Sequence, residues 1–441
     1  MISPSIRAIF YKILSSFTSL IFVWVIAFFL PVKSAGIVLY FYTMVMVVVQ
    51  FSRAGTEYGV IKKSALMEGR GNAELFLYVL LIVFCLAVSV SFFYALVAYF
   101  QGLYVYGDES FWCLLFLLLG AVIFSINQIL ATFHQLSGSI FLQYFYLNIG
   151  CTVCTVFFWV SFSYFWGGFN SIVFCFVFFV VNFFMFLCAF FYFDLNKSLS
   201  VYFVGFSSFK SKVSEIVRFV YPFSIVAFLT IIIQWGGAFL SGSFLSEEDL
   251  GVLSIVIRIS TFSIFGFLAI ETYMSPRLSR LKDYSEAGIL NVTGAFSLIS
   301  VLFCLSFVVF FAFFGEFFLA MLGDSYLKAY DYIMVISFFW LLRVLLGPVD
   351  VILLMAGKVG VIKKNLIIAG LVSVLFGVLL ISQYQLWGAV FALAASRLLL
   401  SFLNSYYVLN IYGLLFVRPK TMAFCFSKAC DYCFKRLLKN V

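Results

Sequence analysis

The chain has 441 residues, of which 65% are hydrophobic and only 10% are charged, with a formal net charge of +9. Globular chains are about 45–50% apolar and about 25% charged, which excludes a soluble enzyme, a disordered chain and a secreted disulfide scaffold. The apolar residues form runs of roughly 18 to 26 residues, and about 20 helical residues cross a bilayer. The sequence therefore predicts a polytopic α-helical membrane protein.

Twelve of these apolar runs are predicted to be transmembrane helices. The apolar stretch of the first helix follows Arg7 and Lys12, and it is longer than the apolar core of a signal peptide, so we expect an uncleaved helix. In chain order, the predicted helices cover residues 9–30, 36–60, 75–100, 111–133, 140–164, 169–193, 219–241, 250–275, 289–314, 332–356, 365–383 and 386–411.

The distribution of Lys and Arg predicts the orientation of the chain. Cytoplasmic connections are enriched in these residues. If the N-terminus is cytoplasmic, 21 of the 27 Lys and Arg residues fall in cytoplasmic segments, only Lys33 and Lys328 fall in outer connections, and the other four lie within the predicted helices. We therefore expect both termini in the cytoplasm. In such a chain the positive charge reports topology, and no nucleic-acid partner is expected.

A polar connection at about 194–218 is predicted to divide the chain into two lobes of six helices. Gly36 opens one helix in GIVLYFY, and Gly251 opens another in GVLSIVI, which is a weak internal repeat. We expect lobes at 1–200 and 201–412, which is the parallel-repeat arrangement of some transporters. The tail at 413–441 is predicted to be a basic amphipathic helix on the inner leaflet; a disordered basic end is the alternative.

Three arginines are predicted near the middle of the membrane in the second half of the chain. At about 1.5 Å per helical residue, Arg258, Arg343 and Arg397 lie roughly 12, 16 and 16 Å from the outer surface. A lipid-facing Arg at this depth costs about 2.5–3.5 kcal/mol, so the three should face a hydrated interior. Guanidinium groups bind phosphate in a bidentate manner, which predicts a site for a phosphate or diphosphate headgroup. Arg53 is a fourth candidate, although it could instead pair with Glu57.

Two acids within the predicted helices are candidates for ion coupling. Asp350 and Glu271 are intramembrane carboxylates, and such groups can carry a proton or Na⁺. Alternatively, Asp350 forms a structural ion pair with Arg343, seven residues away on the same helix face, and Glu271 extends to the nearby inner interface. Arg258 and Arg397 have no acid nearby in the sequence, although another helix could supply one.

No catalytic or cofactor-binding pattern is found in the sequence. It lacks a GxSxG motif, a Walker loop and the His/Glu spacing of a metal site, and His134 is the only histidine. We therefore expect a protein that is not an enzyme and holds no metal or cofactor. Any transport should be secondary or gradient-driven, unless a separate ATPase subunit exists. Uncharged polar residues within the helices, such as Gln234 and Asn404, are expected to form interhelical hydrogen bonds.

Four segments carry a resemblance to a known family. In DLGVLSIVIRISTFSIFGFLAIETYMSPRLSRL, Gly251 opens the helix, Arg258 follows within it, and Pro276-Arg277-Leu278-Ser279 begins the inner loop. The other three are GEFFLAMLGDSYLKAYDYI at 315–333, LWGAVFALAASRLLLSF at 386–402 and SRAGTEYGVIKKSA at 52–65. Together they resemble the polysaccharide (Wzx-type) flippases of the multidrug/oligosaccharidyl-lipid/polysaccharide exporter superfamily.

The resemblance implies a fold of two six-helix lobes around a cationic central cavity, with alternating access between the two faces of the membrane. It implies an undecaprenyl-diphosphate-linked oligosaccharide as substrate, carried to the outer leaflet of the bacterial cytoplasmic (inner) membrane for O-antigen (lipopolysaccharide) or capsule synthesis. A polysaccharide polymerase and a chain-length regulator are candidate partners. The first lobe departs from this pattern, because Arg53 is its only charge near mid-depth.

Two other functions are compatible with the composition. A multidrug exporter of the same fold would need acidic cavity residues to attract cations, whereas the buried charges here are mainly arginines. An integral-membrane glycan polymerase or acyltransferase would need a large outer loop or a site with histidine, and this sequence offers neither.

Overall fold

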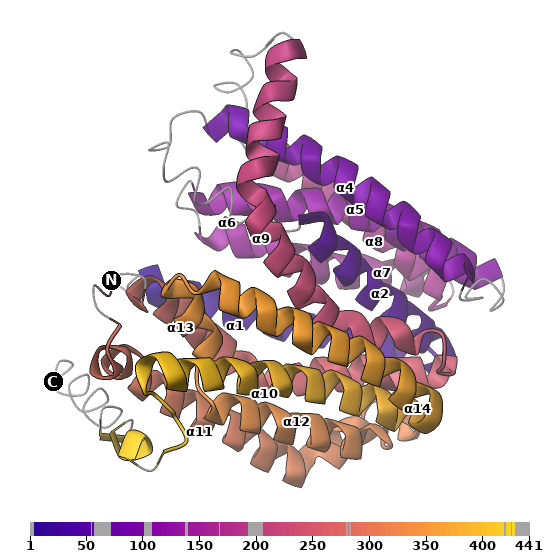
Figure 1. Ribbon diagram of the computed structural model, residues 1–441. Coiled ribbons are helices and arrows are strands. Elements are labelled where there is room, and N and C mark those ends of the chain that lie inside the picture. Colours follow the sequence, from indigo (N-terminus) through magenta and orange to yellow (C-terminus); the bar gives the residue numbers. More distant parts are fainter. Residues whose placement is uncertain are drawn as a thin grey trace, which may run out of the picture. The chain divides into compact units, whose positions relative to one another are not determined.

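All described secondary structure is helical (Figure 1). The structure is a computed structural model, and it describes residues 4–53, 55–56, 72–100, 108–136, 140–166, 168–192, 206–278, 281, 284–418, 420–424 and 426–427. The helices of the first half are α1 (Pro4–Phe29), α2 (Val32–Arg53), α4 (Asn72–Phe100), α5 (Asp108–Leu136), α6 (Ile140–Tyr144), the π-helix η2 (Phe145–Ile149), α7 (Gly150–Trp166) and α8 (Ser171–Tyr192). They are followed by α9 (Phe206–Ser241), α10 (Glu247–Leu278), α11 (Glu286–Ala320), the 3-10 helix η5 (Asp324–Tyr326), α12 (Ala329–Leu345), α13 (Val349–Met355) and α14 (Val359–Tyr412).

The helices confirm the predicted all-α polytopic membrane fold. Within the described residues, eight helices are long and apolar enough to cross a membrane, or nine if the bent pair α12 and α13 forms one span. Two more predicted spans coincide with shorter apolar helices at Phe17–Phe29 and Gly150–Phe165. The last two predicted spans both lie in α14, on either side of a break in its helical backbone. The chain is therefore a multi-pass membrane protein.

The predicted connection at 194–218 is wrong in its second half, because α9 already begins at Phe206. Apolar side chains recur there at helical spacing (Phe206, Phe209, Val213 and Ile216) between Lys and Ser residues, which is the pattern of an amphipathic helix. The part of the predicted connection before Phe206 lies outside the described residues. So does the tail after residue 427, where most of the predicted amphipathic helix would lie.

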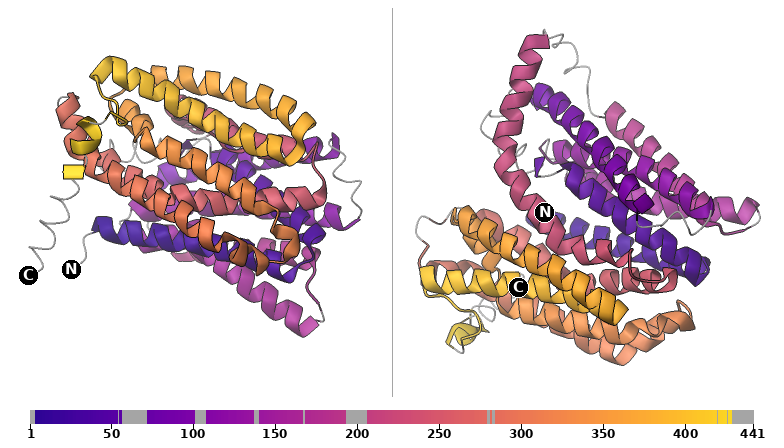
Figure 2. Two further views of the ribbon diagram at one scale, coloured as in Figure 1. Left: turned by 90° about the horizontal axis from the view of Figure 1, so that it is seen from below. Right: turned by 45° about the vertical axis from the view of Figure 1, so that its right-hand side comes forward.

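The structure divides into two compact units. One comprises residues 1–231 and 245–254, and the other comprises residues 232–244 and 255–441. The predicted lobe boundaries at 200 and 412 remain a prediction. In the second unit, α11 packs on α12, and α12 packs on α14; Figure 2 shows these orange to yellow helices side by side in both views.

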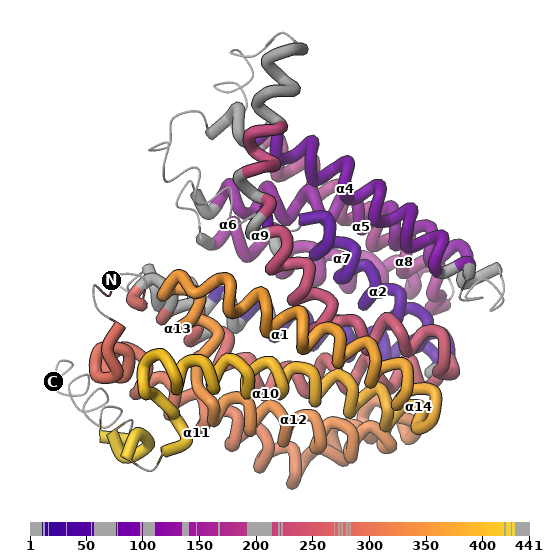
Figure 3. Tube along the Cα trace, viewed as in Figure 1, coloured from indigo at the N-terminus to yellow at the C-terminus, as the bar shows by residue number. Residues whose placement is uncertain are grey.

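The two halves of α14 form a helical hairpin. Gln385 adopts φ 49° and ψ −120° within the helix, so the chain reverses between the predicted spans 365–383 and 386–411. Figure 3 shows the trace of α14 turning back on itself. The hairpin brings residues from the first half of α14 beside residues from its second half, such as Asn365 and Asn404.

The predicted helix at 332–356 is broken, which corrects the expectation of one continuous span. Leu345 ends α12, Val349 begins α13, and the two helices are bent by 44°. Gly347 between them has φ +78°, a left-handed conformation that suits glycine. Pro348 lacks a backbone N–H and its ring clashes with the preceding turn of a helix. The chain therefore bends where Gly347 and Pro348 follow one another.

Candidate functional site

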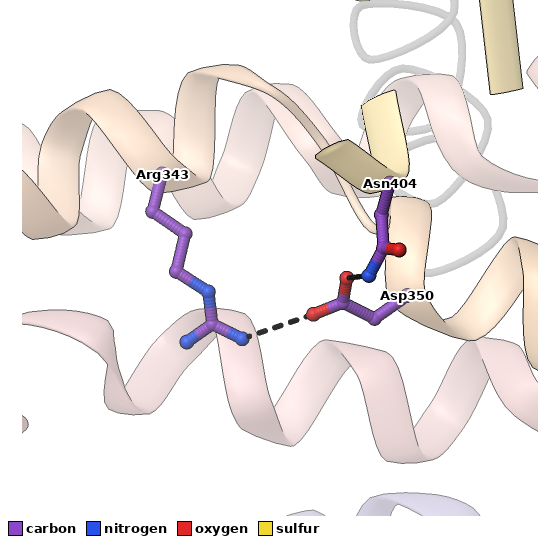
Figure 4. A network of polar contacts seen from close by, with 3 residues as sticks. All are labelled: Arg343, Asp350 and Asn404. Atoms are coloured by element: carbon purple, nitrogen blue, oxygen red, sulfur yellow. Dashed lines mark hydrogen bonds and ion pairs between the residues drawn. The ribbon is translucent and has the colours of Figure 1, made fainter. Parts of the chain in front are cut away.

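An ion pair bridges the break between α12 and α13. Arg343 lies in the last turn of α12, and Asp350 lies in the first turn of α13. The Nη2 atom of Arg343 is 3.4 Å from Oδ2 of Asp350, and the two side chains are 16% and 29% exposed (Figure 4). Asp350 therefore forms the structural ion pair with Arg343 that the sequence offered as the alternative to ion coupling. The predicted span at 332–356 placed Arg343 in the middle of a continuous helix, whereas the structure places it beside the break.

The α14 hairpin adds two asparagines to this pair. Nδ2 of Asn404 donates a hydrogen bond to Oδ1 of Asp350 at 2.6 Å, as Figure 4 shows, and Nδ2 of Asn365 donates to Oδ1 of Asn404 at 2.7 Å. Both asparagines are buried. The network Asn365–Asn404–Asp350–Arg343 therefore fixes the carboxylate from one side by amides and from the other by a guanidinium. The interhelical hydrogen bond expected of Asn404 is confirmed.

Arg397 lies next to this network through a shared tryptophan. The Cζ atom of Arg397 is 4.7 Å from the centre of the Trp340 ring, and Cζ of Arg343 is 5.5 Å from the same centre. Nη2 of Arg397 also donates a hydrogen bond to the backbone carbonyl of Gln234 at 2.8 Å. Cation–π contacts use the face of a guanidinium and leave its in-plane N–H groups available as donors.

The two guanidiniums at the Trp340 ring outnumber the described carboxylates that pair with them. Two guanidiniums contact one indole, but among the described residues Asp350 is the only carboxylate that pairs with either of them. The Nε atom of Arg397 is buried and has no hydrogen-bond partner in the described part of the chain. A buried cation without a counter-charge is costly. The arrangement can therefore bind an anion favourably, because an anion would neutralise the excess positive charge.

Arg258 and Glu271, the other predicted site residues of this half, lie on α10. This helix also carries Phe267, whose ring centre is 5.6 Å from Cζ of Arg343. Arg258 precedes Phe267 by nine residues, which is about 13 Å along a helix. Glu271 follows it by one turn. Both side chains are half-buried, and neither takes part in the described hydrogen bonds and ion pairs of Arg343 and Asp350.

Arg53 belongs to the first unit and has a different environment. Its Nη1 atom donates a hydrogen bond to Oε1 of Gln128 on α5 at 3.1 Å. Glu57, the alternative partner expected from the sequence, lies outside the described residues. Of the predicted anion-binding residues, the structure thus brings together Arg343 and Arg397.

Trp340 and Asn365 are site residues that the sequence analysis did not single out. Trp340 precedes Arg343 by three residues, and residues at this spacing share a helix face, so a search for aromatic neighbours of the buried arginines would have found it. Asn365 carries no such signal, because its partner Asn404 is 39 residues away.

The fold is similar to that of solved transporters and flippases, whereas the sequence itself matches no protein-family model and no curated protein. A multidrug resistance MATE family transporter of the MOP superfamily, in its inward-facing conformation, aligns with a TM-score of 0.70 at 13% identity, over 89% of this chain and 93% of that chain. The lipid II flippase MurJ, in an inward closed conformation, aligns with a TM-score of 0.70 at 10% identity, over 99% of this chain and 93% of that chain. A MOP superfamily transporter from Pyrococcus furiosus, described as having a binding pocket of reverse polarity, aligns with a TM-score of 0.55 at 10% identity, over 92% of each chain.

Proposed function

We propose that this chain is a flippase that moves an undecaprenyl-diphosphate-linked oligosaccharide from the inner to the outer leaflet of the bacterial cytoplasmic membrane by alternating access. The oligosaccharide would be the repeat unit of an O-antigen, a capsule or a similar surface glycan. The observation that carries the proposal is the excess positive charge at Trp340, where Arg343 and Arg397 share one described carboxylate, Asp350.

A diphosphate fits this charge pattern. It carries at least two negative charges, and guanidiniums bind phosphate oxygens through pairs of parallel N–H donors. Arg397 has a buried Nε without a described partner, and the 3.4 Å contact of Arg343 with Asp350 is a long one for an ion pair. Arg397 can therefore bind the first phosphate directly, and Arg343 can exchange its carboxylate for the second.

The remaining predicted residues have secondary roles in this proposal. Arg258 and Arg53 would contact the anion during its passage across the membrane. The coupling ion would bind Glu271, or it would bind Asp350 once Arg343 turns to the substrate. The protein would act without catalysis, with both termini in the cytoplasm, lobes at 1–200 and 201–412, and a tail at 413–441 that lies on the inner leaflet beyond residue 418. A polysaccharide polymerase and a chain-length regulator would be its partners.

The solved structures with this fold support two kinds of substrate. One is named a lipid II flippase, and another is named a multidrug resistance transporter. A multidrug exporter is therefore the second candidate function. The guanidinium pair at Trp340 favours the flippase, because a site with excess positive charge repels cationic drugs.

The test is binding of a soluble prenyl diphosphate, farnesyl diphosphate, to the purified full-length protein in nanodiscs. We expect binding by the wild type and a loss of at least about tenfold in Arg397→Ala, since a hydrogen bond to a charged group contributes about 1.5–3 kcal/mol. Lys364→Ala, which removes an exposed charge from the same helix, should bind like the wild type. Equal binding by Arg397→Ala would contradict the proposal, and binding of tetraphenylphosphonium in place of the diphosphate would favour the multidrug exporter.

A further inference from the structure

The chain turns back toward the α12/α13 break after it leaves α14. Gly413 ends α14 in a left-handed conformation with φ 69°, and Arg418 donates a hydrogen bond to the carbonyl of Gly413 at 3.3 Å. We call residues 413–418 the strap. Its side chains alternate between the interior and the surface: Leu414 and Phe416 are 0% and 4% exposed, whereas Val417 is 43% exposed. Two side chains of the strap are thus anchored in the protein.

The anchor at Phe416 lies directly on the glycine of the break. A Cβ atom built on Gly347 would lie 2.5 Å from the Phe416 ring, so the ring contacts the backbone where any other residue would have a side chain. Gly347 is four residues after Arg343 and three before Asp350. The aromatic ring of the strap therefore packs against the bend that separates the two members of the ion pair.

The bend is buried, and its own backbone hydrogen bonds are short-range. At its centre, the backbone N–H groups of Leu346 and Gly347 donate to Arg343 and Val344 at 3.2 and 3.0 Å, which closes the last turn of α12. Val349 then donates to the carbonyl of Gly347 at 2.9 Å. Because Gly347 has no side chain and the largest conformational freedom of any residue, a group from outside the bend has to hold its angle. The Phe416 ring is the group nearest to the position that a Cβ of this residue would occupy.

We infer that Phe416 is a positioning residue, which sets the angle between α12 and α13 and thereby the position of Arg343 relative to Asp350. This inference rests on the proposed role of Arg343 in binding a diphosphate. Asp350 is held to α14 by Asn404 at 2.6 Å, so α13 is fixed at one end. Movement at Gly347 then displaces α12, and with it Arg343 and Trp340, away from the carboxylate of Asp350 and from Arg397 on α14.

The experiment compares Phe416→Ala with the conservative Phe416→Leu and with Val417→Ala, a control at the exposed neighbour. Hydrogen–deuterium exchange of residues 344–352 reports the bend without any substrate. We expect exchange in Phe416→Ala to be about tenfold faster or more, since removing a packing contact lowers the local opening energy, and Phe416→Leu to restore most of the protection. Binding of farnesyl diphosphate should weaken about tenfold in Phe416→Ala, and Val417→Ala should leave both measurements unchanged.

A second variant approaches the same contact from the other side. Gly347→Ala places a Cβ against the Phe416 ring and puts an alanine at φ +78°, so it should also speed exchange at the bend. In the double variant with Phe416→Ala the clash is gone and only the backbone strain remains, so the combined effect should be smaller than the sum of the two. Unchanged exchange at 344–352 in both variants would overturn the inference. The inference would also be overturned if Phe416→Ala bound farnesyl diphosphate as tightly as the wild type while Arg397→Ala had lost binding. If the wild type fails to bind the probe, the proposed function fails, and the exchange experiment still decides whether Phe416 holds the bend.

Discussion

Replacing Asp350 by Asn separates the two tasks of this carboxylate. The substitution keeps the shape of the side chain and can keep a hydrogen bond with Asn404, but it removes the negative charge that lies 3.4 Å from Nη2 of Arg343. Two guanidiniums would then share the Trp340 ring without a described counter-charge. We expect the protein without ligand to become less stable and its affinity for an anion to rise.

The size of both effects follows from the geometry of the ion pair. At 3.4 Å the direct attraction is roughly 5 kcal/mol for an effective dielectric constant of about 20. Both side chains are partly exposed, and solvent screening reduces the net value to about 1–2 kcal/mol. The unliganded protein should lose this amount of stability. The anion no longer has to displace a carboxylate from Arg343, so its affinity should rise about tenfold.

The assay is thermal unfolding of the purified protein with and without farnesyl diphosphate. Because a ligand stabilises the folded state according to its affinity, Asp350→Asn should start from a lower Tm and show a larger increase with ligand. Asp331→Asn removes an exposed carboxylate from the first turn of α12 and should behave like the wild type. A ligand-induced increase that is smaller than in the wild type would refute competition between the carboxylate and the anion.

Two further substitutions test other contacts. Trp340→Leu should weaken farnesyl diphosphate binding by about tenfold, because each cation–π contact contributes about 0.5–2 kcal/mol. Trp340→Phe keeps a ring face and should lose less affinity. Equal binding by both variants would argue against the role of the ring. Gly36→Ala should lower the Tm through a loss of about 1–3 kcal/mol, because its Cβ would meet the backbone carbonyl of Glu247. Gly360→Ala, where a Cβ meets nothing within 4 Å, is the matched control, and a Tm as high as that control would contradict the close packing.

The helices could be predicted from the sequence because the bilayer requires long apolar runs, and their ends were less predictable. The reversal at Gln385 falls between two predicted spans. The start of α9 at Phe206 was missed, because the Lys and Ser residues of this amphipathic segment lower its mean hydropathy to that of a loop. The break at Gly347 and Pro348 falls inside the predicted helix at 332–356, because a sequence pattern shows where a helix can bend and not whether its hydrogen bonds continue.

The candidate site was predictable where charge was the signal. Arg343, Arg397 and Asp350 stand out because ionisable side chains are rare within apolar helices. Their partners depend on contacts between segments distant in sequence: Arg397 donates to a backbone carbonyl 163 residues away, and every residue has such a carbonyl. Neither this contact nor the position of Phe416 on Gly347 leaves a pattern in a single sequence.

The central claim is that the guanidinium pair at Trp340 carries a diphosphate-linked glycan across the membrane. Its most direct test is the rate at which a fluorescent undecaprenyl-diphosphate-linked oligosaccharide, placed in the inner leaflet of proteoliposomes, becomes accessible to a quencher outside. We predict rapid exposure with the wild type and with Lys364→Ala, and a rate near that of protein-free liposomes with Arg397→Ala. Exposure by Arg397→Ala at the wild-type rate, or none by the wild type, would contradict the claim.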